Sequence, residues 1–275
     1  MNKIPILLTA DGGSTKTMWQ IATAGRELAV METSGLNPFT MDEAEMRARL
    51  QAELQPRLLQ ENWQVTEVAY YGAGCTGEGR SLMARLLAEV TGCTAVVVDS
   101  DIVGAARCLC GQSEGIACIL GTGANSCLYD GQRIVAHTPC LGYILGDEGS
   151  GAVLGSRLVG DVFKGQLPAV LCEAFVQEMA VTADSVIAQV YRAPSANRYL
   201  ASFAPFLGRH IAHPAIRAMV VEEFRRFFVR NVKAYRRADL PVHFVGSIAY
   251  FLRDALAEAA RAEGFTLGQV RRRIF

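Results

Sequence analysis

The stretch TADGGSTKT at residues 9–17 decides how the first part of this chain folds. It joins two segments typical of strands, IPILLTA at residues 4–10 and KTMWQIAT at residues 16–23. A turn between strands leaves backbone N–H groups without strand partners. The glycines let that backbone approach an anion closely, because no Cβ stands in the way. The stretch therefore predicts either a phosphate-binding turn or an ordinary hairpin turn.

The side chains around this turn favour the phosphate-binding interpretation. Ser14, Thr15 and Thr17 supply hydroxyl donors, and Lys16 adds a positive charge if its side chain points inward. Asp11 ends the first strand, and its carboxylate is the kind of oxygen ligand that Mg²⁺ prefers, through water.

A second glycine turn follows the same design at ILGTGANS, residues 119–126. One such turn is weak evidence, but two turns at the starts of two similar α/β segments strengthen each other. We therefore predict two related halves, with domains at residues 1–106 and 107–275.

The remaining patterns predict a mixed α/β protein. Further strands are expected near residues 26–33, 65–74, 94–100, 115–137 and 242–246. Helices are expected near 42–61 with a kink at Pro56, and near 78–92, 101–111, 149–159, 169–179, 182–191, 198–212, 214–236 and 248–263.

The composition limits the function classes. Lys and Arg number 27, as do Asp and Glu, which argues against a general nucleic-acid binder. The basic clusters at 225–237 and 271–273 are interpreted as a solvated helix face and a basic tail. No signal peptide or membrane span is expected. The 8 cysteines lack paired CxxC spacing, which indicates reduced thiols in a cytoplasmic protein rather than a zinc site.

Four motifs together carry a resemblance: DGGSTKT at 11–17, ILGTGAN at 119–125, GDEGSG at 146–151 and VGSIA at 245–249. On these the chain resembles the actin, hexokinase and Hsp70 ATPase superfamily. Within it, the chain is similar to the BadF/BadG/BcrA/BcrD ATPase and N-acetylglucosamine kinase group. The resemblance implies two ribonuclease-H-like domains with a cleft between them that closes over ATP, Mg²⁺ and a sugar.

The resemblance also implies roles for particular residues. The first phosphate loop falls on Gly12, Gly13, Ser14, Thr15 and Lys16, and the second on Gly121, Thr122 and Gly123. The adenosine motif falls on Gly246 and Ser247, and the metal-binding carboxylate on Asp11.

The catalytic base implied for such a kinase is an aspartate that follows a strand of the first domain. The segment VVVDSDIVGAA offers Asp99 and Asp101, and Asp101 occupies the matching position at the start of a helix. We expect Asp101 to accept the proton of the sugar hydroxyl, and Asp99 to be a strand-end or capping residue. The alternative for Asp101 is a plain helix N-cap.

The residues expected to contact the sugar come from several segments: Asn37, Asp101, Asn125, Cys140, Leu141, Gly142 and Asp147. Glu148 is expected to support Asp147, and the alternative role of Asp147 and Ser150 is to cap the following helix. The chain departs from the kinase pattern at Cys140 and Leu141, where N-acetylglucosamine kinases carry a glycine and a tryptophan. The ending LGQVRRRIF is a second departure.

These observations lead to competing functional hypotheses. The first is an ATP-dependent kinase of an amino sugar, N-acetylglucosamine or glucosamine, whose partners are the sugar and ATP. The second is a BadF-type ATPase that activates a partner enzyme through an iron–sulfur cluster, for which Cys127 and Cys140 supply thiols. The third is a sugar or nucleotide sensor, which the presence of Asp11, Lys16 and Asp101 disfavours. Homodimer formation is left open.

Overall fold

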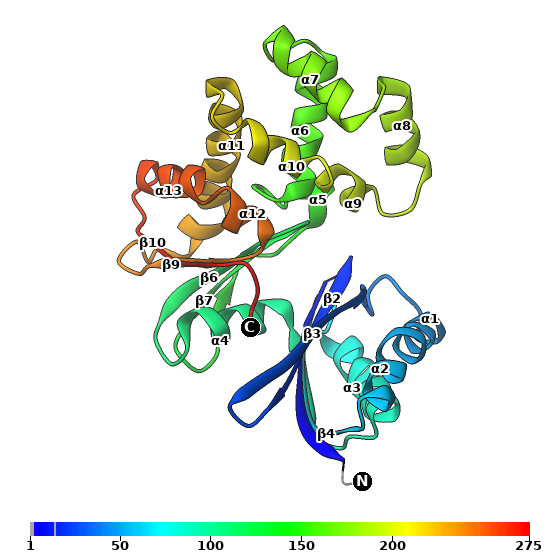
Figure 1. The fold of residues 1–275 in the computed structure, drawn as a ribbon. Helices are drawn as coiled ribbons and strands as arrows, with labels where there is room; N and C mark the ends of the chain where they lie inside the picture. The colour runs from blue at the N-terminus through cyan, green and yellow to red at the C-terminus, as the bar shows by residue number, and fades with distance from the viewer. Residues whose placement is uncertain (1–2, 14) are drawn as a thin grey trace. The chain divides into compact units, whose positions relative to one another are not determined.

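The chain folds into two compact units in a computed structural model that describes residues 3–13 and 15–275 (Figure 1). The first unit runs to Gly104, and the second runs from Ala105 to Ile274. The division lies within helix α4 (Asp101–Cys110). The domain limits expected from the sequence, 1–106 and 107–275, stay a prediction.

The first unit is built on a five-stranded sheet of order β3-β2-β1-β4-β5. Its strands are β1 (Ile4–Gly12), β2 (Lys16–Thr23), β3 (Arg26–Ser34), β4 (Trp63–Gly72) and β5 (Val96–Ser100). The first three form an antiparallel meander, and β4 and β5 add in parallel to β1. The carboxyl ends of β1, β4 and β5 therefore share one edge.

Helices cover this sheet and bury its apolar side chains. They are α1 (Glu43–Arg49), the π-helical turn η1 (Leu50–Leu54), α2 (Gln55–Gln60) and α3 (Gly77–Thr91). The sequence predicts a kink at Pro56, and the structure has the wide π turn immediately before it. Proline lacks an N–H for the α-helical bond, and the Gln55 amide instead donates to the Leu50 carbonyl.

The second unit repeats the same sheet order, as β8-β7-β6-β9-β10. Its strands are β6 (Gly115–Leu120), β7 (Ala124–Tyr129), β8 (Ile134–His137), β9 (Val242–Val245) and β10 (Leu267–Arg271). The first three are antiparallel, and β9 and β10 are parallel to β6. The prediction of two related halves and an α/β fold is thus confirmed, while β10 was missed.

Most helices of the second unit come from the long segment between β8 and β9. They are α5 (Gly142–Leu145), α6 (Gly151–Phe163), α7 (Ala169–Met179), α8 (Ala183–Arg192), α9 (Ala196–Ala201), α10 (Ala204–His210) and α11 (Pro214–Phe227). After α11 come the π turn η2 (Phe228–Val232) and the 3-10 turn η3 (Lys233–Tyr235), and α12 (Ser247–Phe251) and α13 (Arg253–Ala262) follow β9. Within the described residues, no helix is long and apolar enough to cross a membrane.

Each unit has its own hydrophobic core. In the first unit, Trp19 and Tyr70 pack with ring centroids 5.8 Å apart. In the second, Phe228 lies against Phe244 of β9 and stacks on Phe265, which fixes the end of α11 to the sheet. Both cores form because apolar side chains of the strands face the helices that cover them.

Helix α6 packs on α9 through a glycine. A Cβ added to Gly155 would lie 1.9 Å from the carbonyl oxygen of Leu200. The backbones of the two helices are therefore too close for a side chain at residue 155. Gly160 lies in the same helix, and an added Cβ there meets nothing within 4 Å.

These two glycines give a matched test of the packing. Gly155→Ala should lower the free energy of unfolding by about 1–3 kcal/mol, because the Leu200 backbone cannot move aside cheaply. Gly160→Ala should raise it by about 0.5–1 kcal/mol, since alanine favours a helix interior. Urea unfolding followed by circular dichroism measures both. Equal stability of the two variants would contradict the α6–α9 contact.

Candidate functional site

The first glycine turn joins β1 to β2 and is held by its own backbone. The amide of Gly13 donates to the Lys16 carbonyl, and the amide of Ala73 donates to the Gly12 carbonyl. A Cβ on Gly12 would lie 2.1 Å from the Tyr70 hydroxyl oxygen, so only glycine fits there. Ser14, predicted to bind phosphate, lies outside the described residues.

The other residues predicted for this loop differ in orientation. Thr15 accepts a hydrogen bond from the Gly35 amide through its carbonyl. The Lys16 ammonium lies 2.8 Å from the Glu32 carboxylate of β3, and both side chains are about half exposed. In this arrangement the lysine charge is compensated by Glu32, and its predicted phosphate contact would require a change of rotamer.

Three aspartates, Asp11, Asp99 and Asp101, lie at the carboxyl edge of the first sheet. Asp11 is opposite Tyr71 of β4, which is opposite Asp99 of β5. Asp101 directly follows β5 as the first residue of α4. Burial is the main reason that the Tyr70 pKa is raised, and the negative charges of Asp11 and Asp101 raise it further. Both carboxylates therefore act on one buried hydroxyl at this edge.

Asp101 and Asp99 have different surroundings. Asp101 Oδ1 accepts a hydrogen bond from the Ile102 amide at 2.8 Å, at the start of a helix whose dipole favours a carboxylate. Asp99 lies 2.8 Å from the Arg80 guanidinium. Burial and the nearby Asp101 charge raise the pKa of the Cys75 thiol to about 12.

Asn37 approaches the same edge from the loop after β3. Its side chain is buried, and its Oδ1 accepts a hydrogen bond from the Phe39 amide at 2.9 Å. A Cβ on Gly74, just after β4, would lie 2.1 Å from that oxygen. The structure thus brings Asp11, Asn37 and Asp101 to one edge of the first unit.

The second glycine turn is tied to the start of α6. The Gly121 amide donates to the Gly123 carbonyl. The amides of Gly151 and Ala152 donate to the carbonyls of Gly121 and Thr122 at 2.8 and 3.1 Å. A β-hairpin turn and a helix N-terminus therefore hold each other in place.

Two predicted residues pack directly on this turn. Asp147 has φ of 56°, and its Oδ2 lies 3.0 Å from where a Cβ on Gly123 would be. Gly246 has φ of 125°, and a Cβ on it would lie 2.2 Å from the Leu120 carbonyl oxygen. Ser247 then begins α12. Glycine at 246 is needed both for its backbone conformation and for this close approach.

A pocket of about 590 Å³ opens beside the turn, within the second unit. Gly121, Thr122 and Ser247, which the motifs assign to a nucleotide site, line it together with helix residues that no motif pointed to. Those additional residues are Ala201, Ala204, Pro205, Gly208, Arg209, Ile248, Phe251 and Leu252. Arg209 is the charged residue of this lining, and Glu178 holds its guanidinium at 2.7 Å.

The predicted sugar residues of the second unit lie on three segments. Asn125 is on β7, where its Oδ1 accepts a hydrogen bond from His137 Nε2 at 2.8 Å. Cys140, Leu141 and Gly142 precede and begin the short helix α5 and are all exposed. Asp147 lies on the loop after α5.

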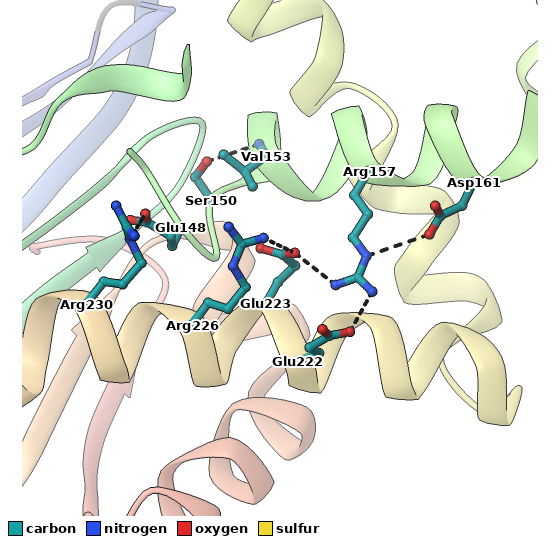
Figure 2. Close-up of polar contacts among 9 residues, drawn as sticks. All are labelled: Glu148, Ser150, Val153, Arg157, Asp161, Glu222, Glu223, Arg226 and Arg230. Atoms are coloured by element: carbon teal, nitrogen blue, oxygen red, sulfur yellow. Dashed lines mark hydrogen bonds and ion pairs between the residues drawn. The ribbon is translucent and has the colours of Figure 1, made fainter. Parts of the chain in front are cut away.

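The loop carrying Asp147 is fixed by its neighbours, as Figure 2 shows. Ser150 accepts a hydrogen bond from the Val153 amide, so Ser150 caps α6. Glu148 is buried, and its carboxylate forms an ion pair with Arg230 beyond the end of α11. The alternative role of capping is thus observed for Ser150, whereas the side chain of Asp147 lies against Gly123.

A buried carboxylate also ties α6 to α11. Glu223 is 1% exposed and pairs with Arg157 of α6 at 2.9 Å and with Arg226 at 3.0 Å (Figure 2). Arg157 reaches Glu222 and Asp161 as well. Breaking one partner of such a buried pair is costly, so this network keeps the two helices in a fixed register.

The two thiols considered for an iron–sulfur cluster differ in their exposure to solvent. Cys127 is fully buried in the second core, whereas Cys140 is exposed. A buried thiol does not lie at a surface where a cluster could be shared with a second chain. Among the described residues, no group of three or more His, Cys, Asp or Glu side chains is placed to hold a metal ion.

Comparisons with known proteins place this geometry in a family. No protein-family model matches the chain, and a search of curated proteins also gave no match. Among solved structures, the chain is 48% identical to a protein from Porphyromonas gingivalis, provisionally assigned as an N-acetylglucosamine kinase. The match covers 98% of this chain and 95% of that one, with a TM-score of 0.94. This chain belongs to the actin-like ATPase superfamily.

More distant members of the superfamily share the fold. A provisionally assigned N-acetylglucosamine kinase from Chromobacterium violaceum is 21% identical, with 97% and 94% of the two chains covered and a TM-score of 0.75. A glucokinase of the ROK family from Streptomyces griseus, solved with glucose and AMPPNP, is 13% identical, with 96% and 93% covered and a TM-score of 0.57. At these identities the likeness shows the fold alone.

The pocket beside the second turn can be tested by filling it. Gly208 lines the pocket, and a Cβ there meets nothing within 4 Å, so a side chain fits without moving backbone. Gly208→Leu should weaken binding of ATP on the order of tenfold or more, because the side chain occupies the space of the ligand. Gly208→Ala, the control, should bind ATP nearly as the unaltered protein does.

Titration calorimetry with ATP measures both affinities, and thermal unfolding checks that the variants are folded. Undiminished ATP affinity of a folded Gly208→Leu variant would show that the nucleotide does not use this pocket.

Proposed function

We propose that this protein is an ATP-dependent kinase that transfers the γ-phosphoryl group to a hydroxyl of an amino sugar, N-acetylglucosamine. Within the superfamily we place it in the BadF/BadG/BcrA/BcrD and N-acetylglucosamine kinase group. The observation that carries the proposal is the 48% identity over 98% of the chain to the Porphyromonas gingivalis protein. The arrangement of charged and glycine residues in each unit supports it.

The nucleotide is proposed to bind through both glycine turns and the pocket of the second unit. The pocket lining is mostly apolar, which suits the adenine ring, and Ser247 supplies a polar group for the ribose. Gly121 and Thr122 line the same pocket, and with Gly123 they are proposed to contact the phosphates. Gly12, Gly13, Ser14, Thr15 and Lys16 are proposed to bind the phosphates from the first unit.

The residues present fit a magnesium ion that arrives with the nucleotide. Mg²⁺ usually keeps several waters and takes one or two carboxylates plus substrate phosphates, rather than a cage of protein ligands. Asp11, at the carboxyl edge of the first sheet, supplies such a carboxylate. Magnesium bound there would neutralise charge on the phosphates during transfer.

Asp101 is proposed as the catalytic base. In the transfer, the bond from the γ-phosphorus to the ADP oxygen breaks, a bond to the sugar oxygen forms, and the carboxylate takes the hydroxyl proton. The Ile102 amide holds Oδ1 and thus orients the carboxylate. Asp101 is the better candidate because it stands at the start of the helix, in the position that matches the family's base, whereas Asp99 pairs with Arg80.

The sugar is proposed to contact Asn37, Asn125 and Asp147, whose oxygens and amide nitrogens match a sugar's many hydroxyls. Leu141 is 57% exposed, so its side chain is available to pack on an apolar sugar face. Cys140 and Gly142 flank it. A leucine lacks the flat surface of a tryptophan, so we expect a higher KM for the sugar than a tryptophan would give.

The base assignment is tested by Asp101→Ala. The variant should lower kcat by about 10²–10⁴-fold, since a positioned general base contributes that much, and should leave ATP binding nearly intact. Asp99→Ala is the control, because it removes the neighbouring carboxylate and its Arg80 contact but leaves the proposed base Asp101 in place.

Sugar-dependent ADP formation measures both variants, with folding checked by circular dichroism. An Asp101→Ala variant as active as the unaltered protein would remove Asp101 from the mechanism.

The substrate class is tested by a panel of hexoses, amino sugars and their N-acetyl derivatives with Mg-ATP. We expect the highest kcat/KM for N-acetylglucosamine and no ADP formation when EDTA removes magnesium. ADP formation that does not depend on any sugar would instead indicate an ATPase that acts on a partner.

A further inference from the structure

One short turn of chain is hydrogen-bonded to all three segments that carry the proposed sugar residues of the second unit. This turn comprises η2 and η3, residues 228–235, which directly follow α11. None of its residues is assigned to the kinase chemistry above. Its hydrogen bonds to the three segments indicate a role for the π and 3-10 turns that follow α11.

Tyr235 links two of these segments. Its hydroxyl lies 2.7 Å from Ser126 Oγ on β7 and accepts a hydrogen bond from the Thr138 amide at 3.0 Å. The side chain is buried, and burial raises the pKa of Tyr235, so the hydroxyl stays protonated at neutral pH. One phenol thereby joins β7 to the segment that leads into α5.

Asn231 links the second of these segments to the third. Its carbonyl accepts a hydrogen bond from Thr138 Oγ1 at 2.9 Å. Its side-chain amide donates to the buried carboxylate of Glu148 at 3.3 Å, and Arg230 pairs with the same carboxylate (Figure 2). Neighbouring residues of η2 thus hold both the segment before α5 and the loop after it.

Each contact falls next to a residue proposed to touch the sugar. Ser126 follows Asn125, and because strand side chains alternate, Ser126 is buried toward the helices while Asn125 faces the other way. Thr138 precedes the segment 140–142. Glu148 follows Asp147. The turn therefore holds each segment through a residue next to a proposed sugar contact: the Ser126 side chain, the Thr138 amide and hydroxyl, and the Glu148 carboxylate.

The π turn provides the geometry for this arrangement. A π turn adds a residue to a helical turn and so rotates the side chains that follow it. Such turns are frequent at functional sites. Here the Lys233 amide donates to the Phe228 carbonyl, and Phe228 is fixed in the core between Phe244 and Phe265. Asn231 and Tyr235 therefore belong to a turn that is anchored in the core by Phe228.

We propose that Tyr235 and Asn231 are positioning residues that hold Asn125, the 140–142 segment and Asp147 in the arrangement required for sugar binding. This proposal rests on the proposed function, because it is the sugar that these segments would bind. The two residues act through Ser126, Thr138 and Glu148 and do not touch the substrate.

The variant Tyr235→Phe tests the proposal, because it deletes only the hydroxyl and keeps the buried ring. Tyr129→Phe is the matched control, since Tyr129 is a buried tyrosine at the other end of β7. We expect Tyr235→Phe to raise the KM for the sugar about three- to tenfold, as for one lost hydrogen-bond centre, with the KM for ATP changed less than about twofold. Tyr129→Phe should leave both KM values unchanged.

A double-mutant cycle with Ser126→Ala sharpens the result. Both substitutions remove the same Ser126–Tyr235 hydrogen bond, so the double variant should raise the sugar KM by much less than the product of the single effects. Asn231→Ala should raise the sugar KM separately, since it removes one of the two contacts to Glu148 but leaves the backbone contact to Thr138.

Amide hydrogen exchange gives a readout that does not depend on catalysis. Tyr235→Phe should accelerate exchange in peptides covering residues 124–126 and 138–150, relative to Tyr129→Phe. Unchanged exchange there would overturn the proposal. Faster exchange with an unchanged sugar KM would overturn it too, because the turn would then be merely structural. If the unaltered protein phosphorylates no sugar, the proposed function fails, and calorimetric binding of the same sugars to the same variants decides the positioning role.

Discussion

Backbone contact at Gly246 is the constraint on which the nucleotide side of this protein depends. The chain runs so close to the Leu120 carbonyl that no side chain fits between them, and the second glycine turn begins at the next residue. This contact joins the end of β6 to the start of α12, and the amides of Gly151 and Ala152 join the same turn to α6. Three elements thereby meet at one point without bulky side chains, and the pocket opens beside it.

Much of this fold could be predicted from the sequence because its signals are local. The glycine turns at 11–17 and 119–126, the apolar strands and the amphipathic helices each follow from a few neighbouring residues. What was missed lacked such signals. The strand β10 is a short LGQVR followed by arginines, and its pairing with β9 is a tertiary contact. The helix α5 has exposed apolar residues and no cap.

Some residues of the candidate site could likewise be predicted from the sequence, and others could not. Asp11, Asp101, Gly123 and Gly246 could be named from motifs, since each motif has a fixed order of residue types. The pocket wall made by Ala204, Gly208 and Phe251 could not be named, because these residues come from helices whose sequences resemble any other helix. The ion pair between Lys16 and Glu32 could not be predicted either, because it depends on the register of β2 against β3.

The second unit differs from the first mainly in the segment between its third and fourth strands. Both sheets run in the same order, but only the second carries a long helical insertion between its third and fourth strands. That insertion supplies the α9 and α10 part of the pocket wall and the turn that is proposed to hold Asn125 and Asp147 in place. Changes within that segment can therefore alter the wall of the pocket without altering the strands beneath it, which are paired with one another through their own backbones.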